Sequence, residues 1–110
     1  CGAGNEYLAV TPTGEIYPCH QFVGNQDFLM GTVFDDSVNE DIRMSFEKSN
    51  VYTKEKCQNC FAKFYCSGGC TANAYNFNKD INKPYSLACE FEKKRVECAI
   101  AIEAIKALDL

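Results

Sequence analysis

The sequence predicts a small α+β domain with an N-terminal β-hairpin, metal-binding cysteine loops and a C-terminal helix. Three observations lead to this class: strand-like runs flank a turn within residues 7–18, four cysteines crowd into residues 57–70, and residues 86–108 carry the clearest helical pattern. A chain of 110 residues is long enough for a single domain with a modest hydrophobic core.

The composition is that of an ordinary folded protein. Hydrophobic residues make up 46% of the chain and charged residues 24%, which disfavours disorder. The net charge of −4 disfavours a general nucleic-acid-binding surface, because phosphate contacts need clustered lysine and arginine. No apolar run approaches the roughly 20 residues of a membrane-spanning helix. We therefore expect neither nucleic acid nor a membrane as a partner.

The N-terminal segment has the pattern of a β-hairpin. Residues 7–10 form an apolar run, residues 11–14 supply turn residues, and residues 15–17 alternate as the returning strand. Such a hairpin carries Cys1 to one side of its first strand and Cys19 past the end of its second, so the two thiols can meet. The alternative is an ordinary hairpin with two incidental thiols.

The next segments are expected to pack on the hairpin. Residues 21–36 read as irregular, apart from a short strand at 31–34, and they carry enough apolar side chains to cover either the hairpin or a metal site. Residues 37–49 read as a short helix that Ser37 or Asn39 can cap. One face of this helix has apolar residues at i, i+4 and i+8: Val38, Ile42 and Phe46. We assign this helix no chemistry.

His20 is the only histidine of the chain. It follows Cys19 directly, and imidazole both binds metals and titrates near neutral pH. A lone histidine beside a ligand cysteine is more often a hydrogen-bond donor to the site or simply exposed. Both roles stay open.

The central cysteines have the spacing C-x2-C-x5-C-x3-C: Cys57, Cys60, Cys66 and Cys70. Thiolates this close usually surround one ion or cluster, and the spacing alone does not choose between zinc and iron–sulfur. The aromatic residues within 61–65 are expected to shield the metal on one side. Gly68 and Gly69 allow a tight turn with N–H groups pointing at sulfur.

Two helices are expected after the central cysteines. Residues 71–77 suit a short helix and residues 79–84 a polar loop, and Cys89 opens or precedes the last helix at about 86–108. Cys98 lies on an apolar stripe of that helix together with Phe91, Ile102 and Ile105. We expect Cys98 to be a small core residue rather than a ligand.

The complete cysteine pattern resembles that of the SPASM domain, a C-terminal extension of many radical S-adenosylmethionine (SAM) enzymes that modify peptides and proteins. Cys1-x12-Gly14-x4-Cys19 is followed after a gap by the central block and after a second gap by Cys89. This matches every element of the family's seven-cysteine pattern over nearly the whole chain. Residues 17–24 and 92–98 look most like the thioether-forming maturases of six-cysteine (SCIFF) peptides, which are related to anaerobic sulfatase-maturating enzymes.

The resemblance implies two auxiliary 4Fe–4S clusters. An outer cluster would be held by four thiolates: Cys57, Cys60, Cys66 and Cys89. An inner cluster, nearer the active site, would be held by three: Cys1, Cys19 and Cys70. Seven thiolates cannot fill two four-ligand sites. The missing ligand would be a residue upstream of Cys1, a substrate thiolate at an open iron, or Cys98.

The resemblance also implies a role within a larger enzyme. Residues 1–110 would be a C-terminal fragment, and a radical SAM barrel in the same chain would bind SAM through a C-x3-C-x2-C motif. The fragment lacks that motif, since Asn73 stands where its third cysteine would be, so we expect it to be inactive alone. It would contact a substrate peptide or protein and take electrons from a donor such as ferredoxin or flavodoxin. Reduced thiols and oxygen-sensitive clusters predict a cytoplasmic location.

Two other classes remain open from the sequence. The first is a structural zinc module without a redox role, and zinc is also a candidate for an isolated domain made in air. The second is an extracellular binding module with disulfides, which an even number of cysteines allows.

Overall fold

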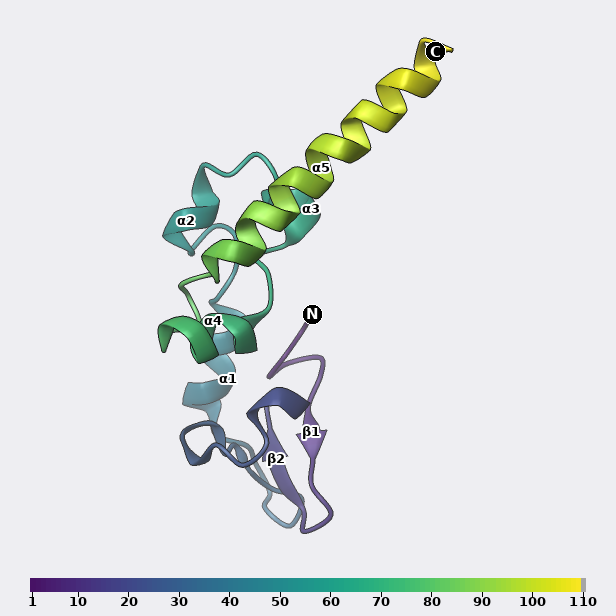
Figure 1. Cartoon of the computed structure of the whole chain (residues 1–110). Coiled ribbons are helices and arrows are strands. Elements are labelled where there is room, and N and C mark those ends of the chain that lie inside the picture. Colours follow the sequence, from purple (N-terminus) through teal and green to yellow (C-terminus); the bar gives the residue numbers. More distant parts are fainter. Residues whose placement is uncertain (110) are drawn as a thin grey trace. The chain divides into compact units, whose positions relative to one another are not determined.

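The computed structural model describes residues 1–109 (Figure 1). The fold is α+β, as predicted, with a three-stranded antiparallel sheet near the N-terminus and helices after it. The chain divides into two compact units: unit 1 is Cys1–Asn50, and unit 2 comprises the described residues from Val51 onward. The expectation that residues 1–110 act as a single domain stays a prediction. Each unit is described by itself below.

Unit 1 is built on the predicted hairpin. Strands β1 (Ala9–Val10) and β2 (Glu15–Tyr17) pair antiparallel, and β2 pairs in turn with β3 (Gly31–Thr32). The hairpin turn requires Gly14, because its φ is +89° and a Cβ there would come within 3.0 Å of the Val33 and Phe34 side chains. The sheet order is therefore β1-β2-β3, with β2 in the centre.

The rest of unit 1 covers this sheet with aromatic and aliphatic side chains. The 3-10 helices η1 (His20–Phe22) and η2 (Gln26–Phe28) precede β3, and α1 (Glu40–Glu47) follows it. The most deeply buried large side chains of unit 1 are Tyr17, Phe22, Met30 and Phe46. The Phe22 ring contacts Phe28 at a centroid distance of 4.3 Å and Phe46 at 5.5 Å. Unit 1 thus has a hydrophobic core of the usual kind.

Helix α1 begins where the sequence predicts a cap. Of the two predicted candidates, Asn39 is the N-cap: its side-chain oxygen accepts hydrogen bonds from the backbone N–H groups of Asp41 at 3.0 Å and Ile42 at 3.2 Å. The predicted stripe is also confirmed, because Phe46 is buried and Val38 and Ile42 are half-buried.

Unit 2 consists of four helices. They are α2 (Glu55–Gln58), α3 (Lys63–Cys66), α4 (Thr71–Asn78) and α5 (Ser86–Ala107). The predicted helices at 71–77 and 86–108 are confirmed as α4 and α5. The cysteine block, expected as loops, contains the short helices α2 and α3. No helix within residues 1–109 is long and apolar enough to cross a membrane.

The structure of helix α5 contradicts the prediction that its apolar stripe, with Cys98, is buried. The predicted apolar stripe is exposed, Phe91 by 69% and Ile102 by 52%, and Cys98 is exposed as well rather than in a core. The covered face is rotated from it and contains Cys89 and Val96. Only the beginning of α5 lies beside the short helices of unit 2, and from residue 97 to 109 every residue is exposed (Figure 1). The stripe has nothing among the described residues to pack on.

Candidate metal centre

Five cysteines line one cavity of about 130 Å³ in unit 2. They come from α2, the turn after it, α3, the turn before α4, and α5: Cys57, Cys60, Cys66, Cys70 and Cys89. Ala62, Pro84 and Ala88 contribute apolar parts of the wall. The cavity thus gathers thiols from a sequence span of more than thirty residues.

Short helices and tight turns bring the first three thiols together. Cys57 lies in α2 and is 8% exposed, and the backbone N–H of Cys60 donates to the Cys57 carbonyl at 3.1 Å, which closes a turn between them. The backbone N–H of Cys66 donates to the Ala62 carbonyl at 2.9 Å in α3. One turn therefore bridges the C-x2-C spacing, whereas the C-x5-C spacing takes two, because the Lys63 N–H donates to the Cys60 carbonyl at 3.3 Å before the Cys66 N–H donates to Ala62.

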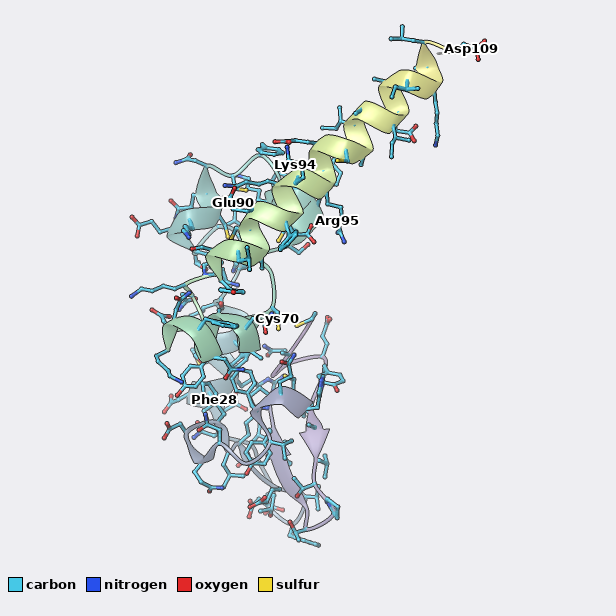
Figure 2. All side chains as sticks on the ribbon, in the orientation of Figure 1. Phe28, Cys70, Glu90, Lys94, Arg95 and Asp109 are labelled. Carbon is cyan, nitrogen blue, oxygen red and sulfur yellow. The ribbon has the colours of Figure 1, made fainter. Side chains whose placement is uncertain are left out.

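A strained turn connects the next cysteine. Ser67, Gly68 and Gly69 have φ angles of +59°, +95° and +74°, so three successive residues adopt left-handed conformations. Cys70, labelled in Figure 2, follows directly and is the N-cap residue of α4. The predicted tight turn at the two glycines is confirmed. Cys89 lines the cavity from the first turn of α5, where its backbone N–H donates to the Tyr85 carbonyl at 3.1 Å.

The aromatic shield predicted within residues 61–65 is wrong. Phe61, Phe64 and Tyr65 are exposed by 56%, 66% and 73%, and none of them lines the cavity. Ala62 faces inward instead and is 1% exposed. Since Ala62 is the N-cap residue of α3, a helical turn that directs it inward directs its aromatic neighbours toward solvent.

Burial controls the protonation of one thiol. Removal from water raises the pKa of the Cys57 thiol above its ordinary value, and the thiols of Cys89, Cys66 and Cys60 add to this rise. The ammonium of Lys54 acts in the opposite direction. A metal that takes Cys57 as a thiolate must therefore displace a proton from it.

Lys54 is a feature that the sequence analysis missed. It is 2% exposed, and its Nζ donates a hydrogen bond to the carbonyl of Gly68 at 3.0 Å. Burial lowers the pKa of Lys54, whereas the nearby cysteines, with Cys57 first, raise it. Nothing in the residues around position 54 separates this lysine from the exposed ones, so only the packing reveals it.

Unit 1 holds two of the predicted ligands. Cys19 is buried two residues after the end of β2, and Cys1 is exposed. The backbone N–H of Gly4 donates to the Pro18 carbonyl at 2.9 Å, so the segment beginning with Cys1 runs beside the end of β2. Cys70, the third predicted inner ligand, belongs to unit 2 and lines the cavity there. The inner ligand set stays a prediction.

The remaining candidates lie outside the cavity. His20 is exposed, and its Nδ1 lies 3.2 Å from the hydroxyl of Tyr7, which gives it a hydrogen-bond role in unit 1. Cys98 lies on the exposed part of α5. No disulfide forms within residues 1–109, and no three His, Cys, Asp or Glu side chains of this part of the chain converge on a single-ion site.

The donor set fits a thiophilic metal group. Thiolates select zinc, copper(I) or iron–sulfur over magnesium or calcium. The cavity combines these sulfurs with an apolar part of the wall, which suits an iron–sulfur cluster. Charged and polar side chains line it as well: Lys56, Lys63, Asn73, Glu90, Glu92 and Lys93. On donor chemistry alone, zinc fits as well.

Comparison with known proteins identifies the family of this domain. Residues 1–61 match the model of the SPASM family, described as an iron-sulfur cluster-binding domain. The chain belongs to the SPASM family. The matched segment includes Cys1, Cys19, Cys57 and Cys60, whereas Cys66, Cys70 and Cys89 follow it. SPASM domains bind iron–sulfur clusters, so the predicted family and the predicted type of cofactor are confirmed at this level.

One relative extends the comparison over the whole chain. An uncharacterized protein of Archaeoglobus fulgidus is 32% identical over 118 aligned residues. The match covers 100% of this chain and 25% of the relative. The chain therefore spans about a quarter of the length of that protein.

Proposed function

We propose that this SPASM domain carries two auxiliary 4Fe–4S clusters for a radical SAM enzyme that modifies a peptide or protein, with thioether formation as the favoured reaction. The cavity lined by five cysteines is the observation that carries the proposal. The outer cluster would be held by Cys57, Cys60, Cys66 and Cys89. The inner one would be held by Cys1, Cys19 and Cys70.

The chain's own residues have distinct tasks in this function. The ligand cysteines must lose their thiol protons, and the apolar wall formed by Ala62, Pro84 and Ala88 limits water at the sulfurs. The clusters would supply electron transfer, or would hold a substrate cysteine at an open iron. The three-cysteine composition of the inner set favours the second role for the inner site.

The remaining parts of the reaction would lie outside this chain. A radical SAM barrel, N-terminal in the same protein, would bind SAM and generate the radical, and a ferredoxin or flavodoxin in the cytoplasm would supply electrons. The length of the Archaeoglobus relative, about four times the matched region, leaves room for such a barrel.

The first experiment measures iron, sulfide and zinc in protein purified and reconstituted without oxygen. Two 4Fe–4S clusters give about eight irons per chain and broad absorbance near 400 nm. Stoichiometric zinc that iron does not displace would overturn the proposal in favour of a structural zinc module. Titration of thiols in denaturant, run on the same sample, tests for disulfides.

Cysteine variants test the ligand assignment. Cys57→Ala should lose about half of the iron, and Cys98→Ala, the matched control on an exposed site, should keep all of it. Cys89→Ala and Cys70→Ala should each lose one cluster, and their electron paramagnetic resonance spectra should differ. Identical spectra would mean that Cys70 and Cys89 serve the same cluster. Full iron in Cys57→Ala would contradict the outer ligand set.

A further inference from the structure

Lys54 is the only buried charged side chain that residues 1–109 contain. A buried ammonium is costly unless an anion or several hydrogen bonds compensate it. Its hydrogen bond to the Gly68 carbonyl, at 3.0 Å, supplies part of this compensation. A carbonyl is a dipole rather than a full charge, so a second source of negative potential is needed.

The cysteines of the cavity are that source. Four of them act electrostatically on Lys54, all in the direction that favours its charged form: Cys57, Cys66, Cys70 and Cys89. All four also line the cavity, as does Gly68. Neutral thiols compensate a cation weakly, whereas thiolates around a 4Fe–4S core give the site a net negative charge. The charge of Lys54 is therefore better compensated when the cysteines hold a cluster as thiolates than when they are neutral thiols.

The absence of a side chain at Gly68 leaves room for the Lys54 ammonium. A Cβ on Gly68 would lie 3.2 Å from Lys54 Nζ and 3.6 Å from its Cδ. Gly69 has a similarly left-handed φ, yet a Cβ there would meet nothing within 4 Å. Strain at Gly69 is therefore a backbone effect only, whereas Gly68 combines backbone strain with contact to the lysine.

We propose that Lys54 is the buried counter-ion and positioning residue of the cysteine cavity: it fixes the Cys66–Cys70 turn through the Gly68 carbonyl and raises the reduction potential of the cluster bound there. The inference rests on the proposed function. A positive charge stabilises the more negative, reduced state of a cluster, and burial limits screening of that charge by solvent.

The test compares three variants of Lys54 in the anaerobically reconstituted protein. Lys54→Gln keeps a donor for the Gly68 carbonyl without the charge, Lys54→Met removes both, and Lys54→Arg keeps the charge. The control is Lys56→Met, which removes an exposed charge at the cavity wall, whereas Lys54 lies behind that wall and reaches it through the Gly68 carbonyl. Lys56 Nζ donates a hydrogen bond to Ser86 Oγ at 2.6 Å. Readouts are iron per chain, far-ultraviolet circular dichroism and the midpoint potential from a redox titration.

We expect Lys54→Gln to load iron but to make reduction of one cluster about tenfold less favourable, a fall of about 59 mV for a one-electron couple. Lys54→Met should show the same fall together with a loss of iron, and Lys54→Arg and Lys56→Met should keep potentials closer to wild type. If Lys54→Met does not fold, the midpoint potential of Lys54→Gln alone tests the proposal. Full iron with unchanged potentials in both neutral variants would overturn the proposal, as would an equal fall in Lys56→Met.

A glycine pair tests the positioning role separately. Gly68→Ala should lose more iron than Gly69→Ala, because only the first places a methyl group against Lys54. Equal losses would show that backbone strain alone fixes the turn, which contradicts the positioning role. The iron content of the wild-type protein separates the two hypotheses. Wild-type protein without iron would contradict the proposed function. Iron-loaded wild type with unaffected variants would contradict only the role of Lys54.

Discussion

The two units of the chain bury different kinds of side chain. The large apolar side chains that are fully buried all belong to unit 1, and they include Tyr17, Phe22 and Met30. The buried apolar residues of unit 2 are small: Val51, Cys57, Ala62, Ala72, Ala74, Pro84 and Val96. At the centre of unit 2 there is instead a cavity lined by thiols. We therefore expect unit 1 to be stabilised mainly by the hydrophobic effect and unit 2 to depend on a metal group bound by its cysteines.

The largest expected effect is that of metal removal. Chelation should abolish amide protection in α2, α3 and α4 but leave protection of β1, β2 and β3, because metal binding to cysteine sites contributes folding energy directly, about 10–16 kcal/mol for structural zinc in small peptides. Hydrogen exchange read by mass spectrometry measures both units in one sample. Equal protection of unit 2 with and without metal would contradict the contrast between the units.

The second effect is a core truncation in unit 1. Phe46 is 6% exposed and contacts the Phe22 and Phe28 rings at 5.5 and 5.9 Å. Phe46→Ala should destabilise unit 1 by about 3–5 kcal/mol. Urea unfolding followed by exchange in β1 to β3 gives the value, and Met44→Ala, on the exposed face of the same helix, is the control. A loss that depends strongly on metal would mean that the units are not independent in stability.

A smaller effect depends on pH and distinguishes the metal-free from the loaded form. The pKa of Cys57 is raised in the fold, so the neutral thiol is favoured there. Its contribution to stability is present below the unfolded pKa of about 8.5 and is lost as pH rises through the folded pKa. Metal-free unit 2 should therefore weaken above pH about 8.5, by at most about 1.4 kcal/mol per pH unit for one proton.

Denaturation of the metal-free protein at a series of alkaline pH values measures this slope. Cys57→Ser should flatten it, because a hydroxyl does not titrate in this range, and unit 1 should not share it. A slope that persists in Cys57→Ser would assign the effect to another thiol.

The smallest effect concerns the cap of α1. Asn39→Ala removes two hydrogen bonds to the first turn and should cost unit 1 about 1 kcal/mol. Asn39→Ser should restore most of this stability, and Ser37→Ala, at the candidate cap that the structure does not use, should change little. Thermal unfolding of the three variants provides the comparison. A larger loss in Ser37→Ala would mean that the helix starts earlier in solution.

The sequence was most informative where its signals are local. The turn chemistry at Gly14, the cap at Asn39 and the long helical pattern after Ser86 each predicted an element that the structure contains. Helices α2 and α3 were missed, because four residues are too few to show a helical period. The cysteine spacing led to the correct family.

The errors concern which face of an element is buried. The aromatic residues after Cys60 and the stripe through Cys98 are both apolar, yet both are exposed. Their orientation depends on what lies opposite them, which the local pattern does not contain. Lys54 was missed for the converse reason: a lysine is expected at the surface, and its burial follows only from contacts with a glycine fourteen positions away.

Helix α5 combines a base packed on the rest of unit 2 with a tip, residues 97–109, that is exposed in the described part of the chain. At about 1.5 Å per residue its 22 residues span about 33 Å. Lys94 and Arg95, labelled in Figure 2, come just before Val96, the last residue of α5 that is not exposed. Within the tip, one i,i+3 ion pair joins Lys106 to Glu103 at 3.0 Å. Such pairs contribute only tenths of a kcal/mol. The tip can therefore unwind and rewind as a local fluctuation while the first turn, which carries Cys89, stays in place.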